Sequence, residues 1–140
     1  PKGKIIIIGG GLIGCETADF LSTGANEVTI VEMRKKIAFD VGKNSRPFLL
    51  QRLYQKKIKM LTSSPVKEIT TDGVLLTDKD GNEQTIKADA VVLATGLKSN
   101  KKLLNELQKS SADIYTAGDC IEPRRILDAI HEGFNVGFNV

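Results

Sequence analysis

Three glycines near the N-terminus have the spacing that lets a backbone approach a phosphate closely. They form the pattern Gly9-x-Gly11-x-x-Gly14, with Leu12 and Ile13 before the third glycine. In this pattern the first glycine makes a tight turn, the second leaves room for a pyrophosphate, and the third lets a helix pack closely on a strand. The N–H groups and the dipole at the start of that helix can bind phosphate oxygens. The spacing predicts a dinucleotide site.

The acidic residue Glu32 lies 21 positions after Gly11 and bears on which dinucleotide is bound. A carboxylate at the end of the second strand can accept hydrogen bonds from both ribose hydroxyls of NAD, and it repels the 2′-phosphate of NADP. Arg34 and Lys35 follow closely enough to neutralise a 2′-phosphate, or they belong to a solvated turn. The pattern favours NADH and leaves NADPH as the alternative.

The elements that would position these residues begin with a strand, a helix and a second strand. Apolar, β-branched runs predict buried strands over 4–8 and 27–31, and apolar residues at helical spacing predict a helix over 12–23 between them. Such a unit of about 30 residues makes its two strands parallel neighbours. The glycine turn therefore lies between the first strand and the helix, where a dinucleotide site requires it.

After the second strand the sequence predicts one more helix and strand, and then an antiparallel meander. A helix is expected over 44–57 and a short strand over 59–62. The apolar stripe expected of that helix consists of Phe48, Leu49, Leu53 and Ile58. Short alternating runs separated by Asp-Gly turns then predict an antiparallel three-stranded meander at 66–70, 74–77 and 84–87.

Four further elements complete the predicted fold. They are a buried strand over 90–94, a short helix over 100–107, a last strand over 113–116 and a terminal helix that opens at Pro123. The last strand could pair beside the strand at 90–94, which would make one compact domain. The predicted fold class is α/β, a Rossmann-like doubly wound parallel sheet in which a three-stranded antiparallel β-meander replaces one crossover helix.

Composition and charge argue against several classes of function. The chain has 140 residues and a net charge of +3, from 20 basic and 17 acidic residues. The basic residues are scattered, and five Phe, two Tyr and no Trp offer little for base stacking, so no nucleic-acid partner is expected. The apolar runs are too short to span a membrane. Cys15 and Cys120 form no metal or disulfide motif, and two reduced thiols indicate a cytoplasmic location.

Four stretches of the sequence carry a family resemblance: residues 9–16, 90–96, 117–120 and 123–133. Together they resemble the NADH:flavin oxidoreductases of the 2-enoate reductase and 2,4-dienoyl-CoA reductase type, within the pyridine nucleotide–disulfide reductase superfamily. The resemblance implies that residues 1–97 form an NAD(P)-binding domain. It also implies that residues 98–140 are a returning C-terminal segment of an FAD-binding domain.

The resemblance also assigns roles to individual residues. Glu16 corresponds to a glutamate near the nicotinamide, or it is simply an exposed helix residue. Thr95 and Gly96 correspond to the end of the meander region beside the nucleotide. Asp119, with Gly118 before it, corresponds to the acid that contacts the ribityl–phosphate portion of FAD, and the terminal helix to one whose N-terminus faces the flavin ring.

The expected function is that of an NAD(H)-binding module of a flavin-dependent oxidoreductase, which delivers hydride from NADH to FAD in an intact parent protein. Full members of the family have an earlier FAD fingerprint, an iron–sulfur cluster and an FMN barrel, which are absent from this sequence. These flavin and iron–sulfur portions are the expected partners, and this chain by itself is expected to bind FAD poorly and to turn over little. No proton-transfer residue is assigned, because hydride transfer belongs to the cofactors. A non-catalytic nucleotide-binding module and a small oxidase that binds free FAD are the alternatives.

Overall fold

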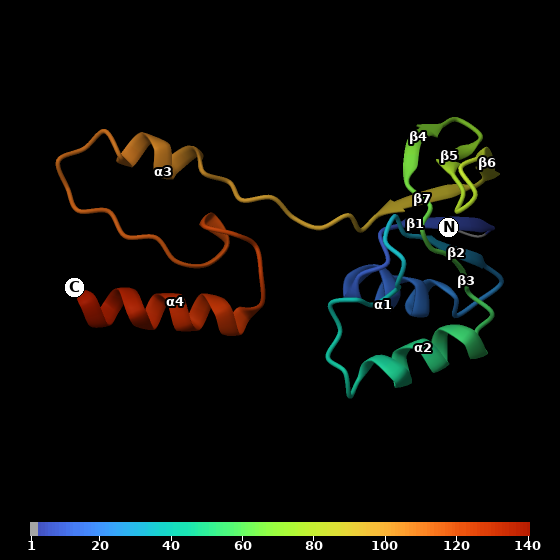
Figure 1. Cartoon of the computed structure of the whole chain (residues 1–140), viewed down its shortest axis with the longest axis horizontal. Coiled ribbons are helices and arrows are strands. Elements are labelled where there is room, and N and C mark those ends of the chain that lie inside the picture. The colour runs from blue at the N-terminus through green and yellow to red at the C-terminus, as the bar shows by residue number, and fades with distance from the viewer. Residues whose placement is uncertain (1–2) are drawn as a thin grey trace. The chain divides into compact units, whose positions relative to one another are not determined.

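The computed structural model describes residues 3–140. The chain divides into two compact units, unit 1 (Pro1–Thr95) and unit 2 (Gly96–Val140). All the strands formed by the described residues lie in unit 1, and unit 2 consists of helices and irregular segments (Figure 1). None of the helices formed by residues 3–140 has the length and apolar character needed to cross a membrane.

Unit 1 is built on a four-stranded parallel sheet with the strand order β3-β2-β1-β7 (Figure 1). Its strands are β1 (Lys4–Ile8), β2 (Glu27–Val31), β3 (Lys59–Leu61) and β7 (Ala90–Leu93). The register of the central pair runs from Lys4 opposite Glu27 to Ile8 opposite Val31. The sequence predicted each of these strands to within one residue at either end.

Two helices cover one face of the sheet and a meander covers the other (Figure 1). The helices are α1 (Leu12–Leu21) and α2 (Arg46–Gln55), and the meander consists of β4 (Val66–Thr70), β5 (Gly73–Thr77) and β6 (Glu83–Lys87). Successive residues of a strand point to opposite faces. Ile5 and Ile7 of β1 therefore pack into the core under the helices, and Ile6 and Ile8 into the core under the meander. The predicted α/β fold with a meander crossover is confirmed.

The helices α1 and α2 are each shorter than the predicted 12–23 and 44–57, and two details of packing in unit 1 also differ from the sequence prediction. Phe48 is 67% exposed, whereas Leu49 and Leu53 are buried, because α2 has only one face against the core and Phe48 lies outside it. The strand β7 is only partly buried, and its Leu93 is 65% exposed. This strand pairs with β1 alone among the described residues, so it is an edge strand of the sheet.

Unit 2 contains α3 (Lys102–Leu107), a short 3-10 helix η1 (Gly118–Cys120) and α4 (Ile126–Asn139). The prediction of a strand over 113–116 is wrong, because this segment lies in unit 2, where no strand is available to pair with it. The terminal helix begins at Ile126 rather than at Pro123. Arg125 is still extended, and its N–H donates to Asp128 Oδ2 at 3.1 Å, which fixes the start of the helix.

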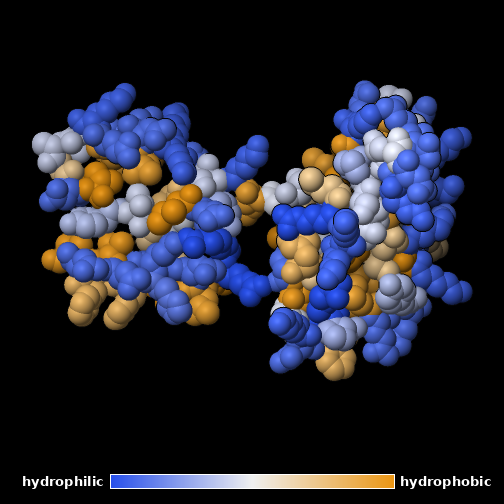
Figure 2. Space-filling model, in the orientation of Figure 1, coloured by the Kyte–Doolittle hydropathy of each residue, from blue (hydrophilic) through white to orange (hydrophobic). Residues whose placement is uncertain are grey.

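The buried core of the described chain lies entirely in unit 1. In unit 2 every residue is partly or fully exposed, and large apolar side chains reach the surface (Figure 2). The most exposed of them on α4 are Ile126, Leu127, Ile130, Phe134 and Phe138. Unit 2 thus has apolar surface that it cannot bury by itself.

Candidate nucleotide site

The glycine turn between β1 and α1 is built on positions that exclude a side chain. Gly9 has a φ of +111°, and a Cβ there would collide with the carbonyl oxygen of Ala94. A Cβ at Gly14 would collide with the carbonyl oxygen of Gly9, so α1 can lie this close to β1 only with a glycine at that position. Gly9 therefore allows the tight turn after β1, and Gly14 allows the close packing of α1 on β1, as the sequence pattern predicts.

Glu32 ties the end of β2 to this turn. Its Oε2 accepts a hydrogen bond from the N–H of Gly10, and its Oε1 accepts one from the N–H of Arg34, each at 2.7 Å. The residue is only 5% exposed. A carboxylate this buried is stable because charge-assisted hydrogen bonds compensate for its lost hydration. The predicted ribose-binding residue is thus next to the glycine turn, with each oxygen already accepting one bond.

A second carboxylate, that of Asp40, lies on the N-terminus of α1. The N–H of Leu12 donates to both Asp40 oxygens, at 2.9 and 3.1 Å. A Cβ at Gly11 would lie 3.1 Å from Asp40 Oδ2. Asp40 could not be predicted from the sequence, because it lies in a long irregular stretch whose path back to the turn has no local signal.

The segment that carries both carboxylates, residues 32–45, connects β2 to α2 and folds over the glycine turn. The N–H of Ala38 donates to the carbonyl oxygen of Gly10 at 2.6 Å, and Ile37 and Ala38 are both buried. The Arg46 guanidinium holds the carbonyl oxygen of Ile37 with two bonds, at 2.9 and 3.2 Å. These contacts hold Ile37 and Ala38 in place, with Asp40 two residues further along the chain.

Cys15 is buried beneath the turn and contributes no reactive thiolate. Its Sγ donates to the carbonyl oxygen of Gly10 at 3.4 Å. Burial raises the pKa of the Cys15 thiol to about 11, so the thiol remains protonated at neutral pH. Since the thiolate is the reactive form, Cys15 is a packing residue.

The other predicted residues of unit 1 are Ile13, Glu16, Arg34 and Thr95, and among the described residues their side chains form no hydrogen bond with the turn. Ile13 and Glu16 are exposed on α1. Arg34 is also exposed, and its guanidinium lies over the ring of Phe39, 3.9 Å from the ring centroid. The backbone nitrogen of Thr95 lies close to Gly9, at the end of the neighbouring strand β7.

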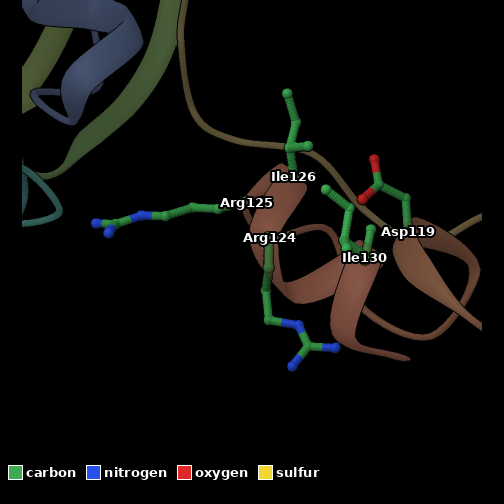
Figure 3. Close-up of a pocket in the computed structure, with 6 residues that line it drawn as sticks. Asp119, Arg124, Arg125, Ile126 and Ile130 are labelled. Atoms are coloured by element: carbon green, nitrogen blue, oxygen red, sulfur yellow. The ribbon is translucent and has the colours of Figure 1, made fainter. Parts of the chain in front are cut away.

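Unit 2 contains the remaining predicted residues, Gly96, Gly118 and Asp119. Of these three, only Asp119 lines a hollow of about 480 Å³ in this unit. The hollow is lined by Asp119, Arg124, Arg125, Ile126, Ala129 and Ile130. The side chains of Asp119, Ile126 and Ile130 point to the same side, while the two arginines point away from it (Figure 3). The Gly118 N–H donates to Glu132 Oε2 at 2.7 Å, and Glu132 also pairs with Arg124, so η1 and α4 are held together.

The parallel sheet, the glycine turn and the meander define a Rossmann-like protein of the kind found in flavoprotein reductases. Residues 1–133 match the family model described as pyridine nucleotide-disulphide oxidoreductase, and the chain belongs to this family. The predicted superfamily is thereby confirmed. The family is one of oxidoreductases whose members bind NAD(P) and FAD.

The chain is similar over nearly its whole length to much larger reductases. It is 36% identical over 138 residues to the NADH oxidase of Thermoanaerobacter brockii, and 36% identical over 141 residues to the cinnamate reductase of Clostridium sporogenes. In both comparisons the aligned region covers 98% of this chain and 21% of the relative. A solved 2-naphthoyl-CoA reductase complex superposes with a TM-score of 0.84 at 32% identity, again over 98% of this chain and 21% of the other. The chain thus spans about a fifth of the length of these relatives.

Proposed function

We propose that unit 1 binds NADH, and that the chain is the nicotinamide-nucleotide module of a larger flavin-dependent oxidoreductase. The observation that carries this proposal is the glycine turn. Gly9 and Gly14 exclude side chains for steric reasons, and the α1 N-terminus that follows already holds an anionic group, the Asp40 carboxylate. A turn that brings a backbone N–H group and a helix dipole to an anion has the properties that a pyrophosphate requires.

Glu32 is the proposed partner of the ribose hydroxyls. An ionised carboxylate offers about four lone-pair positions. Two of them accept the N–H groups of Gly10 and Arg34, which leaves acceptor capacity for a diol. A carboxylate here also repels a 2′-phosphate, which supports NADH over NADPH. Arg34, whose guanidinium lies over Phe39, is the group through which NADPH would be tolerated.

The nicotinamide supplies the hydride chemistry when it is bound, and this chain supplies binding and orientation. In the intact protein the hydride acceptor would be FAD, to which unit 2 contributes Gly118, Asp119 and the start of α4. Two observations support this role for unit 2: its hollow is lined by Asp119, and its apolar surface is left uncovered in this chain. The larger relatives have the length needed to supply the rest of such a flavin domain.

A coenzyme titration of the chain, followed by nicotinamide fluorescence, tests the proposal. We expect saturable NADH binding without added FAD and weaker binding of NADPH. The Gly11→Ala variant should weaken NADH binding by about tenfold or more, because its Cβ occupies the approach of the pyrophosphate. Gly11 has a φ of −72°, which alanine adopts without strain, and the nearest neighbour of the new Cβ is the movable Asp40 side chain.

Gly42→Ala is the matched control, because a Cβ there meets nothing within 4 Å. It should bind NADH like the unchanged chain. Equal affinity of the Gly11→Ala and Gly42→Ala variants would contradict the placement of the pyrophosphate at the turn. Absence of NADH binding by the unchanged chain would contradict the proposed function of unit 1.

A further inference from the structure

The position proposed for the pyrophosphate is held by a carboxylate of the chain itself. We propose that Asp40 is an internal competitor of the dinucleotide, which sets its affinity by occupying the N-terminus of α1 until the pyrophosphate displaces it. This inference rests on the proposed function of unit 1. It adds an affinity-determining residue that the glycine pattern and Glu32 do not include.

The geometry places Asp40 where the phosphate must come. Both of its oxygens accept the Leu12 N–H, the first N–H of α1, at 2.9 and 3.1 Å. Its Oδ2, Oδ1 and Cγ atoms lie 3.1, 3.4 and 3.5 Å from the point where a Cβ of Gly11 would be. The Asp40 carboxylate therefore lines the space that Gly11 keeps open by having no side chain.

The start of α1 also explains why a distant carboxylate is found there. Gly11 is the N-cap residue and provides no side-chain cap, and the first turn of α1 contains no acidic residue. The N–H groups at a helix start need acceptors, and the helix dipole favours a negative charge. Asp40 supplies an acceptor for the first of these N–H groups, that of Leu12, and places a negative charge at the helix start. A pyrophosphate would meet the same needs, and two anions a few ångströms apart repel each other, so the two groups exclude one another.

In the connection that carries Asp40, the backbone at Ile37 and Ala38 is fixed, and the Asp40 carboxylate two residues further on lies at the surface. The Ala38 N–H is bonded to the Gly10 carbonyl oxygen, and Ile37 and Ala38 are buried. The Asp40 side chain itself is exposed. Displacement of the Asp40 side chain from Leu12 therefore requires no change in the contact between Ala38 and Gly10.

The test compares Asp40→Asn with Asp72→Asn in the full 140-residue chain. The asparagine at position 40 keeps an oxygen that can accept the Leu12 N–H but removes the charge. Asp72 is an exposed residue in the turn between β4 and β5, so its substitution removes one charge at a site without contact to the glycine turn. We expect Asp40→Asn to bind NADH on the order of tenfold more tightly than the unchanged chain. Asp72→Asn should bind like the unchanged chain.

Adenosine is the second probe, because it carries the ribose and base but no phosphate. Its affinity should be the same in all three chains, since it does not compete with Asp40. Amide NMR spectra of the unchanged chain provide a readout that needs no variant. The signals of Leu12 and of residues 39–42 should shift on addition of NADH and remain in place on addition of adenosine.

The outcomes separate the two proposals. NADH binding by the unchanged chain, with equal or weaker binding by Asp40→Asn, would overturn the role of Asp40 and leave the proposed function standing. NADH binding that leaves the Leu12 signal unmoved would also overturn it. If no chain binds NADH, the proposed function and this inference fail together.

Discussion

The carboxylate of Glu32 and the backbone N–H of Gly10 form a buried hydrogen bond of 2.7 Å, which joins the end of β2 to the turn after β1. The same carboxylate accepts the N–H of Arg34. Glu32 is therefore part of the structure of the turn, in addition to its proposed role at the ribose. A substitution of Glu32 should therefore lower the stability of the fold as well as the affinity for the coenzyme.

The first prediction concerns the stability of Glu32→Ala. Removal of the carboxylate leaves the buried N–H of Gly10 and the part-buried N–H of Arg34 without their acceptor, and an unsatisfied buried group costs about 1–3 kcal/mol. We expect the free energy of unfolding to fall by about 2–4 kcal/mol in a urea titration. Glu16→Ala, at an exposed position of α1, should change it by less than about 0.5 kcal/mol. Equal stability of the two variants would show that the Glu32 carboxylate does not support the turn.

The second prediction concerns the close approach of α1 to β1. In Gly14→Ala the new Cβ would collide with the Gly9 carbonyl oxygen, which belongs to the backbone and cannot rotate away. Helix and strand must then separate, and we expect a loss of about 3 kcal/mol in unfolding free energy. Gly42→Ala, with open space around it, should remain within about 0.5 kcal/mol of the unchanged chain. A Gly14→Ala chain of unchanged stability would mean that α1 does not lie this close to β1.

The parts of the fold that the sequence predicted well are those with a local signal. The strands β1 and β2 follow from unbroken β-branched runs, and the meander follows from alternation and Asp-Gly turns. Asp40 has no such signal, because its contact with Leu12 depends on the path of an irregular connection. The segment 113–116 has strand-like residues, but a strand needs a partner, and unit 2 provides none within the described chain. Strand propensity was misleading at 113–116 because a segment forms a strand only where another strand lies beside it.

The third prediction concerns the stability of unit 1 at acidic pH. Asp19 of α1 is paired with Arg52 and Lys56 of the α2 region, at 3.1 and 2.7 Å. The hydrogen bond from Lys56 is the main reason that the pKa of Asp19 lies below its usual value of 3.8. A carboxyl group whose pKa is lower in the folded than in the unfolded chain stabilises the fold above the unfolded pKa, and this contribution is lost as the pH falls through the folded pKa.

We therefore expect the stability of unit 1 to decline as the pH falls below about 4, where the carboxyl groups of the unfolded chain become protonated. Asp19→Asn should reduce the stability at pH 7 by about 1 kcal/mol and flatten this part of the decline. Urea titrations at several pH values measure both effects, with Asp72→Asn as the control. An unchanged pH profile in Asp19→Asn would show that these ion pairs do not contribute.

The fourth prediction concerns the two thiols. Cys15 is fully buried with a pKa of about 11, whereas Cys120 is partly exposed in unit 2. At pH 8 we expect a disulfide reagent to label one thiol per native chain and both in urea, because only an accessible thiolate reacts. Cys120→Ser should abolish the native labelling and leave the labelling in urea at one thiol. Fast native reaction of Cys15 would mean that the turn above it opens readily.

The fifth prediction follows from the unequal burial of the two units. Unit 1 has apolar cores on both faces of its sheet, whereas no residue of unit 2 is buried. Apolar burial is the main source of resistance to unfolding, so unit 2 should open far more often than unit 1. Brief digestion of the chain with a nonspecific protease should cut after residue 95 and leave unit 1 intact, as mass spectrometry would show. In a longer protein that covers the exposed face of α4, the same sites should be protected. Early cuts in the meander turns, with unit 2 left whole, would reverse this order of stability and contradict the assignment of the core to unit 1.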